Sequence, residues 1–516
     1  MSPKLKQKIF TYADFDLQKL CHLASTLRRA SCVCDPDQRP ASGSFNWAIF
    51  VLFDDGTRWV LKSPHERTSM PSNIGRKTLA SEAATLLYLK AYSNIPVPEV
   101  FEYCDTSNND IGIPFILMSE ARGVQLSNFW RPASSPESTQ GTCNKAKILS
   151  QLGAITWELS QLRFDKIGSL LEREGTFHTT ECLSRSHVLY ERFSLDIPRG
   201  PFCSETEFYD SVISAFLAHA ETLSLSHHCF VAPVPKKNEY DTHSAYIQAV
   251  DLWNDFVTVG CKTESSTNRL DYIIVASALR EIIQSHSLAS DDRNSFPLYH
   301  ADLSVNNIYV DEEYNITCII DWGFASSVPE FMLLAPPGLP QFRDEISQDL
   351  YKSFIDGFIA AIPDSFDKIA THRYQKSLSY SQVSWRLTRL LSLDSLDDYS
   401  LFSTVWDFVH GPSTDLGQYL LAQRSSSHFS HIYRSIEQDD VPASQIKDKE
   451  QDYFDKEPLR YTIAKKLTLI SEWNSQHETN SPRLRERMFL ADSRLWKSII
   501  QFMQIWEDNS SDRALV

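Results

Sequence analysis

Two short stretches near the middle of the chain constrain its fold more than any other feature. The first, residues 300–307, reads His-Ala-Asp-Leu-Ser-Val-Asn-Asn, and the second, residues 319–323, reads Ile-Ile-Asp-Trp-Gly. Between them, the apolar runs 307–310 and 316–320 are joined by a polar turn, which predicts a β-hairpin. The hairpin brings Asp302 and Asn307, which share one loop, close to Asp321 at the end of the adjoining strand.

Two carboxylates and an amide in the pattern H-x-D-x-x-x-x-N…D-x-G suit phosphoryl transfer. One carboxylate must orient the attacking hydroxyl and accept its proton, while an amide oxygen and a second carboxylate must hold magnesium on the phosphates. The competing interpretation is coincidence, because Asp and Asn are common in turns and caps. The complete pattern beside two apolar strands favours phosphoryl transfer.

The first 120 residues contain a second group of motif residues, independent of the one around Asp302. The turn 42–46 precedes an apolar strand over 47–53, Asp54-Asp55-Gly56 signals a hairpin, and Lys62 ends the returning strand 58–62. Glu82 lies in a predicted helix over 77–92. A nucleotide kinase needs a turn over the phosphates, a strand lysine that reaches them and a helix glutamate that holds the lysine. Taken alone, Lys62 reads as a solvated strand-end lysine and Glu82 as a surface residue.

These motifs resemble the aminoglycoside phosphotransferase and choline kinase type of small-molecule kinase, within the protein-kinase-like superfamily and in its long fungal form. Residues 299–325 are similar to the signature H-G-D-L-H-x-x-N-I-L-V-D…I-I-D-W-E-x-A of that family. The matching segments of the first lobe are 43–46, 55–62, 95–98 and 118–123, and further segments at 164–170 and 199–202 match the long fungal members. The resemblance covers about residues 35 to 330.

The resemblance implies a bilobal α+β fold, with a small β-rich lobe and a large, mainly helical lobe, that binds ATP and Mg²⁺. Asp302 would be the catalytic base, and Asn307 and Asp321 the magnesium ligands. The nucleotide would meet Gly43, Ser44, Lys62, Glu82 and, at the hinge, Met118, Ser119 and Glu120. His300 would support the catalytic loop, and the phosphate acceptor would be a hydroxyl of an unidentified small molecule.

Three positions depart from the family signature: Ala301 replaces glycine, Ser304 replaces the common histidine and Gly323 replaces the common glutamate. The first alternative function is a protein kinase. Ala301 stands where protein kinases carry arginine, and Val328-Pro329-Glu330 follows Asp321 too soon to close a usual activation segment. The second alternative is a catalytically silent pseudokinase or binding module, which the intact set of motif residues disfavours.

The predicted segments are an N-terminal helical extension over 1–34, with a helix at 17–30, and a β-rich lobe over 35–120. A helical insertion and the catalytic loop occupy 121–345, and a helical C-terminal extension packs on that lobe over 346–516. From residue 145 onward the chain is predicted to be largely helical, with 297–325 as the main exception.

Charge and composition limit the partners. The net charge of −16 disfavours nucleic-acid binding, and no apolar run approaches 18 residues, so no membrane span is predicted. Ten cysteines without a C-x-x-C pair indicate reduced thiols and a cytoplasmic location. A mitochondrial presequence is the alternative, because Arg28 and Arg29 follow a lysine-bearing start, although Asp14 and Asp16 interrupt it. The oligomeric state is left open.

Overall fold

The computed structural model describes residues 8–43, 45–65, 70–130, 139–189, 192–222, 229–230, 266–285, 295–341, 344–392, 398–411, 414–439 and 489–490. The chain divides into two compact units. One comprises Met1–Ala215 and Arg280–Ser392, and the other comprises Phe216–Leu279 and Leu393–Val516. The segment limits expected from the sequence, near residues 34, 120 and 345, stay predictions.

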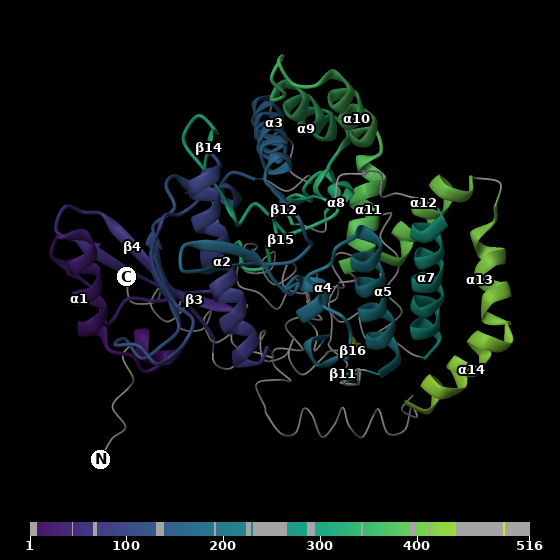
Figure 1. Ribbon diagram of the computed structural model, residues 1–516, viewed down its shortest axis with the longest axis horizontal. Helices are drawn as coiled ribbons and strands as arrows, with labels where there is room; N and C mark the ends of the chain where they lie inside the picture. The colour runs from purple at the N-terminus through teal and green to yellow at the C-terminus, as the bar shows by residue number, and fades with distance from the viewer. Residues whose placement is uncertain are drawn as a thin grey trace, which may run out of the picture. The chain divides into compact units, whose positions relative to one another are not determined.

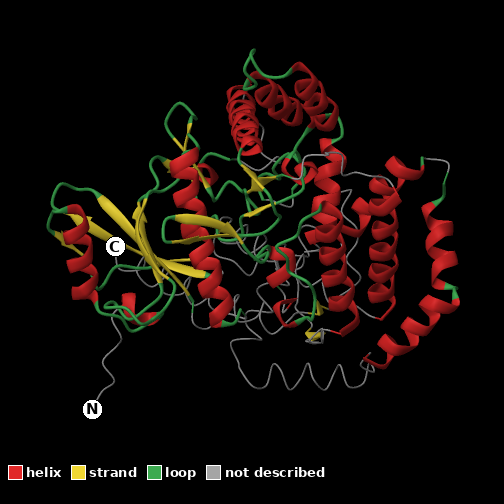
Figure 2. Ribbon diagram, in the orientation of Figure 1, coloured by secondary structure: helices red, strands yellow, loops and turns green. Residues whose placement is uncertain are grey.

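The first unit begins with a β-rich lobe built on one antiparallel sheet, drawn in yellow in Figure 2. Its strands are β1 (Cys32–Val33), β2 (Ala41–Ser42), β3 (Asn46–Phe53), β4 (Arg58–Pro64), β5 (Val100–Cys104) and β6 (Phe115–Ser119). The order is β1-β3-β4-β6-β5, and β2 also pairs with β3. Successive side chains of a strand point to opposite faces, so Trp47, Ile49 and Val51 of β3 all enter the core of this lobe.

Two helices pack on this lobe (Figure 1). Helix α1 (Leu17–Arg28) begins after Asp16, whose carboxylate accepts a hydrogen bond from the Lys19 N–H at 2.9 Å, and it buries Leu20 and Ala24 in the same core. Helix α2 (Ser72–Tyr92) begins five residues before the predicted start and contacts β4, β5 and β6. Glu82 therefore lies on a helix that packs against the strand carrying Lys62.

The rest of the first unit is mainly helical. Its helices are α3 (Thr139–Gln161), α4 (Arg185–Val188), α8 (Glu330–Leu333), α9 (Gln348–Ala360), α10 (Lys368–Leu378) and α11 (Ser381–Ser392), with 3₁₀ turns η1 (Lys8–Thr11), η2 (Leu126–Asn128) and η3 (Arg192–Ser194) along the unit. Helices α3 and α9 lie side by side (Figure 1). They approach so closely that a Cβ on Gly153 would lie 2.1 Å from the Phe354 carbonyl oxygen.

Three small antiparallel sheets hold the loops of this lobe. One has the order β14-β13-β7, from Ile316–Ile319, Ile308–Val310 and Val124–Gln125; another has β15-β12-β8, from Ser326–Ser327, Phe296–Tyr299 and Arg163–Phe164; the third pairs β9 (Leu170–Arg173) with β10 (Thr176–Thr179). The predicted catalytic hairpin is thus present. The prediction of helix from residue 145 to 296 is wrong between 163 and 179, where the chain turns through Glu174 and Gly175 at positive φ.

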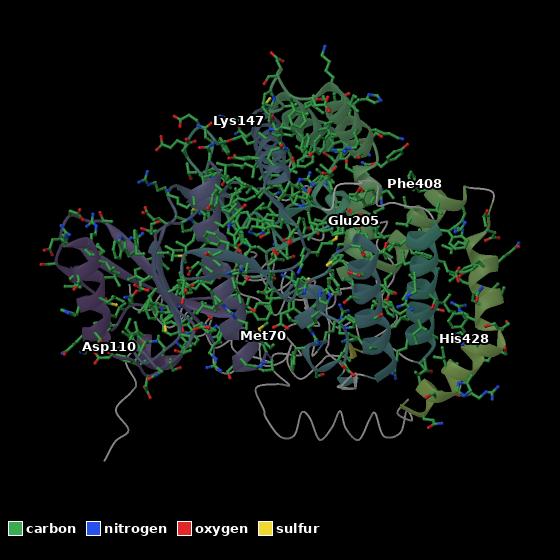
Figure 3. All side chains as sticks on the ribbon, viewed as in Figure 1. Met70, Asp110, Lys147, Glu205, Phe408 and His428 are labelled. Atoms are coloured by element: carbon green, nitrogen blue, oxygen red, sulfur yellow. The ribbon has the colours of Figure 1, made fainter. Side chains whose placement is uncertain are left out.

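Helix α3 fixes the position of the β13–β14 hairpin. Lys147, labelled in Figure 3, donates a hydrogen bond to the Glu313 carbonyl oxygen at 2.6 Å. The Gln151 side chain donates to the Tyr314 carbonyl oxygen and accepts from the Ile316 N–H, both at 2.8 Å. These hydrogen bonds connect the turn of the hairpin to α3. They therefore fix the position of β14, the strand that leads to Asp321.

The second unit has its own small core. It contains α12 (Asp398–His410), α13 (Leu416–Arg424), α14 (Ser427–Ile436), the turn η5 (Glu437–Asp439) and the short pair β11 (Cys229–Phe230) and β16 (Phe489–Leu490). The boundary between the units falls inside α5 (Glu205–Thr222) and α7 (Ser266–Ser285). Leu270, Ile274 and Phe429 pack together, and Arg424 makes a bidentate ion pair with Asp271 at 2.6 and 2.7 Å.

The predicted fold class is confirmed: a small β-rich lobe precedes a large, mainly helical part of the chain. In the part of the chain that the structure describes, no helix combines the length and the apolar character needed to cross a membrane.

Candidate active site

The buried ammonium group of Lys62 joins the two lobes of the first unit. Its Nζ atom lies 2.7 Å from each carboxylate oxygen of Glu82 on α2, and 2.9 Å from Oδ1 of Asp321 after β14. Lys62 is 9% exposed and Glu82 only 2%. The sequence placed these three side chains in one site, and the structure brings them within direct contact.

The three charges set one another's protonation. Burial alone would lower the pKa of Lys62, but the carboxylates of Asp321 and Glu82 more than offset this and hold that pKa above its ordinary value. The ammonium group lowers the pKa of Asp321. Burial raises the pKa of Glu82, against the opposing effect of Lys62. The side chain of Asp321 is 42% exposed, so its carboxylate can reach a ligand.

The backbone at Asp321 has an unusual conformation. Its φ is +65°, in the left-handed region that L residues rarely adopt and that Asp tolerates better than most. Next to it, a Cβ on Gly323 would lie 3.4 Å from Thr78 Cγ2 and 3.5 Å from Glu82 Oε2. Gly323, where the family signature has glutamate, therefore lies against α2 beside the Lys62–Glu82 pair.

His300 connects the catalytic loop to the strand that precedes Asp321. Its Nδ1 atom accepts from the Asp302 N–H at 3.1 Å, which assigns the ring proton to Nε2, and Nε2 donates to the Ile320 carbonyl oxygen at 3.0 Å. Burial lowers the pKa of His300, so the neutral ring is favoured. The ring also packs edge-on against Trp322, at 4.5 Å between centroids. These contacts connect His300 to both segments, and its supporting role in catalysis stays a prediction.

Asn307 lies beside the same strand. Its side-chain amide donates to the Asp302 carbonyl oxygen at 2.8 Å, and its own carbonyl oxygen accepts from the Ile320 N–H at 2.9 Å. The amide oxygen of Asn307 and the carboxylate of Asp321 are hard oxygen donors of the type that Mg²⁺ prefers, with phosphate and water oxygens completing the shell. No cluster of three or more His, Cys, Asp or Glu gathers as a metal site within the described ranges. The donor set thus suits Mg²⁺ held together with a nucleotide.

Arg185, which belongs to none of the predicted motifs, contacts the predicted base. Its Nη1 atom donates to Oδ2 of Asp302 at 2.9 Å, and its guanidinium lies 5.9 Å from the centroid of the Phe324 ring. Arg185 begins the short helix α4, 117 residues before Asp302. No motif marks it in the sequence, and only the folded chain shows that it belongs to the site.

The predicted phosphate loop forms the turn between β2 and β3. The Gly43 N–H donates to the Asn46 carbonyl oxygen at 2.9 Å, and the His65 N–H donates to the Phe45 carbonyl oxygen at 2.8 Å. Phe45 packs edge-on against Phe324, at 5.4 Å between centroids. The turn therefore folds toward the segment after Asp321. Ser44, also predicted to meet the phosphates, lies outside the described residues.

The predicted hinge residues lie at and directly after the end of β6, which pairs with the central strand β4. Met118 and Ser119 of β6 pair with Val60 and Trp59 of β4. The carboxylate of Glu120 makes an ion pair with Arg58, whose Nε donates at 2.8 Å. These contacts show how the hinge is anchored, and contact with adenine stays a prediction.

Comparison with curated proteins finds a relative that matches most of the chain. A subtelomeric hrmA-associated cluster protein of Aspergillus fumigatus is 25% identical over 418 residues, which cover 76% of this chain and 75% of the relative. The protein named altered inheritance of mitochondria protein 9, mitochondrial, of Candida dubliniensis is 31% identical over 120 residues, 23% of this chain and 19% of the relative. No family model matches the chain.

Comparison with solved structures gives matches of low sequence identity. A protein assigned as a fructosamine-3-kinase of Thermobifida fusca matches with 14% identity and a TM-score of 0.38, over 76% of this chain and 98% of that one. An ethanolamine kinase of Plasmodium vivax matches with 12% identity and a TM-score of 0.32, over 76% and 83%. Because both TM-scores are below 0.5, the geometry of the site itself must support any functional proposal.

Proposed function

We propose that the chain is an ATP- and Mg²⁺-dependent phosphotransferase that transfers the γ-phosphoryl group to a hydroxyl of a small molecule. The network from Glu82 through Lys62 to Asp321, on residues that the motif assigned to the nucleotide, is the observation that carries the proposal. In this reaction Lys62 binds the α and β phosphates, and Glu82 keeps its ammonium group in place.

Asp302 orients the acceptor hydroxyl and accepts its proton, while the new bond forms between that oxygen and the γ-phosphorus and the bond to the β-phosphate oxygen breaks. Arg185 and the His300 bond to the Asp302 N–H hold the loop and the carboxylate in position before substrate arrives. Because the transition state is loose, positioning and electrostatics supply most of the rate enhancement. Bound Mg²⁺, held by Asn307 and Asp321, would neutralise charge on the phosphates.

A protein kinase is the nearest alternative, and one structural observation disfavours it. After Asp321 the chain enters β15 at Ser326, which pairs with β12, and α8 begins at Glu330. This short, sheet-bound connection leaves no room for the long activation segment that protein kinases use to dock a peptide. A silent nucleotide-binding module is the second alternative, and turnover distinguishes it.

The test is a thermal-shift titration with MgATP, because a ligand that binds only the folded state raises the melting temperature. We expect a clear rise for the wild type, little rise for Asp321→Ala, and a wild-type response for Asp356→Ala, which removes an exposed carboxylate on α9. Equal rises in all three would show that Asp321 does not hold the nucleotide's metal.

The acceptor requires a second measurement. Purified protein is screened against a metabolite library for ATP consumption, with generic protein substrates as a parallel arm. Consumption with small hydroxyl compounds supports the proposal. Phosphorylation of proteins alone would favour the protein kinase alternative, and nucleotide binding without turnover would favour the silent module.

A further inference from the structure

The β9–β10 hairpin of the mainly helical lobe reaches the β-rich lobe of the first unit. Its strand β9 lies against α2, the helix that carries Glu82 (Figure 1). Residues 168–181, which comprise the two strands and the residues next to them, form a strap between the lobes. Because the strap belongs to one lobe and α2 packs on the other, contacts between them help to decide where Glu82 lies.

The strap contacts α2 on both sides of Glu82 in the chain. Before Glu82, Lys77 makes an ion pair with Glu181. After it, the Tyr88 ring packs edge-on against Phe177, at 5.2 Å between centroids. Lys77 and Tyr88 are about three turns apart, so they lie on nearly the same face of the helix. A tilt of α2 in this stretch would therefore break at least one of the two contacts.

A third contact joins the strap to the sheet of the β-rich lobe. The Tyr103 hydroxyl on β5 donates a hydrogen bond to Oε2 of Glu172 on β9 at 2.8 Å. Burial and this carboxylate raise the pKa of Tyr103, so the hydroxyl keeps its proton and remains a donor at neutral pH. A charged acceptor makes such a bond stronger than one between neutral groups. The same hairpin thus contacts the sheet as well as α2.

The strap begins on the segment that follows Asp321. The fully buried Ser169 hydroxyl donates to the Ala325 carbonyl oxygen at 3.2 Å. The Gly168 N–H donates to Ser327 Oγ at 3.0 Å, and the Ser327 N–H donates to the Gly168 carbonyl oxygen at 2.9 Å. The strap therefore connects α2 with the segment after Asp321 by contacts that do not involve the buried lysine of the site.

We propose that the strap holds α2 in place, so that the Lys62–Glu82–Asp321 network assembles without an activating partner or a covalent modification. In protein kinases, the position of the helix that carries the corresponding glutamate is a point of activation control. In this chain, the strap supplies that position. Phe177 is then a positioning residue that acts on nucleotide binding through Glu82. The inference rests on the proposed phosphotransferase function and adds to it how the site is regulated.

The first test measures the protection of Lys62 without nucleotide. Although Lys62 is buried, its pairing with Asp321 and Glu82 holds its pKa above the ordinary value, so an acylating reagent meets little neutral amine. Labelling by acetic anhydride is measured by mass spectrometry in the wild type and in two variants. Phe177→Ala removes the ring that contacts α2, and His178→Ala removes a ring from the exposed, opposite face of β10.

Loss of the Phe177 ring should let α2 open locally. We expect the labelling rate of Lys62 to rise about tenfold in Phe177→Ala. It should keep its wild-type value in His178→Ala. Unchanged protection of Lys62 in Phe177→Ala overturns the inference. If Phe177→Ala does not fold, Tyr103→Phe removes a single hydroxyl from the same set of contacts, and we expect a rise of about threefold, whose absence also overturns the inference.

A second reporter separates local opening of α2 from general unfolding. Cys318 on β14 is 3% exposed and belongs neither to the strap nor to α2. An alkylating reagent therefore reaches Cys318 only when a wider region opens. We expect Cys318 to stay protected in Phe177→Ala while Lys62 becomes labelled. A parallel rise at both residues would show that Phe177 contributes only general stability, and it would overturn the inference.

Nucleotide binding measures the consequence for the site. Calorimetry with MgATP should show an affinity about fivefold weaker in Phe177→Ala, because Glu82 no longer holds the ammonium group of Lys62 in place. His178→Ala should bind as the wild type does, and so should Phe177→Tyr, which keeps the ring.

The failure of the inference and that of the proposed function give different results. If the wild type and Phe177→Ala bind MgATP equally well, the phosphotransferase proposal stands and the strap has no role in the site. If the wild type does not bind MgATP, the phosphotransferase proposal is lost. The labelling of Lys62, which needs no nucleotide, still decides whether the strap holds α2.

Discussion

Asp321 shows how a single backbone angle prepares the candidate site. A non-glycine residue at φ +65° costs of the order of 1–3 kcal/mol unless its surroundings hold it there. Two kinds of contact keep Asp321 in this conformation. Its carboxylate makes an ion pair with Lys62 at 2.9 Å, and the preceding backbone N–H groups of Ile319 and Ile320 donate to the carbonyl oxygens of Pro96 and Asn307. The carboxylate is thereby fixed toward Lys62 before any nucleotide is present.

The first prediction separates the two aspartates. Asp302→Asn keeps the shape of the side chain and removes the proton acceptor, so MgATP binding should stay near normal while turnover falls by about 10²-fold or more. Asp321→Asn should weaken MgATP binding as well, because it removes the charge opposite the metal. Calorimetry gives binding and a coupled assay gives turnover on an acceptor from the screen. Full turnover in Asp302→Asn would show that Asp302 is not the base.

At the residue scale, the motif residues of the candidate site could be predicted from the sequence, whereas Arg185 could not. Lys62, Glu82, Asp302, Asn307 and Asp321 belong to motifs with fixed spacing, so their convergence could be predicted. Arg185 could not, since nothing in its neighbourhood distinguishes it and its contact with Asp302 depends on how the insertion folds back. The roles of the motif residues in binding and turnover stay predictions.

Among the elements, strand and hairpin signals were reliable where local pattern and burial agree. The β3–β4 hairpin was predicted from Asp54-Asp55-Gly56, and Gly56 has the expected positive φ of +81°. The β9–β10 hairpin was missed, because its turn places Glu174 at φ +51° and Glu-Gly is a weak turn signal. The early start of α2 also escaped prediction, since Gly75 within its first turns lowers helix propensity.

The second prediction concerns the contact between α3 and α9. A Cβ on Gly357 would lie 2.0 Å from the Ser150 carbonyl oxygen, so Gly357→Ala must push the two helix backbones apart. Overpacking of this kind typically costs about 1–3 kcal/mol, and we expect a loss of about 2 kcal/mol in the free energy of unfolding, measured with urea. Gly75→Ala on α2 is the control, because its Cβ would meet Pro64 at an ordinary 3.6 Å. That change should stabilise slightly through helix propensity, and a comparable loss in both variants would contradict the close-packing explanation.

The third prediction is a pH dependence located in α4. His187 is fully buried between Ser184 Oγ, 2.8 Å from its Nδ1, and Ser211 Oγ, 3.0 Å from its Nε2. Burial, followed by the charges of Arg199 and Arg192, lowers the pKa of His187 to about 3. The unfolded chain takes up this proton near pH 6.5 and the folded chain does not, so stability present above about pH 6.5 is lost as the pH falls.

Because of this one group, we expect the free energy of unfolding to fall by about 1.4 kcal/mol as the pH is lowered from 7.5 to 5.5. Urea denaturation at the two pH values measures the change in the wild type and in His187→Gln, which has no proton to take up. On acidification, the free energy of unfolding of the variant should fall by about 1.4 kcal/mol less than that of the wild type. An identical loss in both proteins would mean that His187 carries its proton in the folded state.

At the scale of the whole molecule, one buried ion pair couples stability to the candidate function. Lys62 comes from the sheet of the β-rich lobe, and its partners come from α2 and from the loop after β14. A buried pair of this kind contributes little net stability, but removing one member leaves a charge without compensation. Stability and nucleotide binding should therefore respond differently to single and double substitution.

The last prediction uses that difference. Lys62→Met leaves Glu82, which is 2% exposed, without its partner, so we expect a loss of about 3–5 kcal/mol in the free energy of unfolding. The double variant Lys62→Met/Glu82→Gln carries no buried charge at Glu82 and should recover most of this loss. It should not recover the thermal response to MgATP, because the ammonium group that binds the phosphates is still absent. Urea denaturation and the MgATP titration, run on both variants and the wild type, measure the two quantities. A double variant that regained its nucleotide response along with its stability would show that Lys62 acts only as a structural residue.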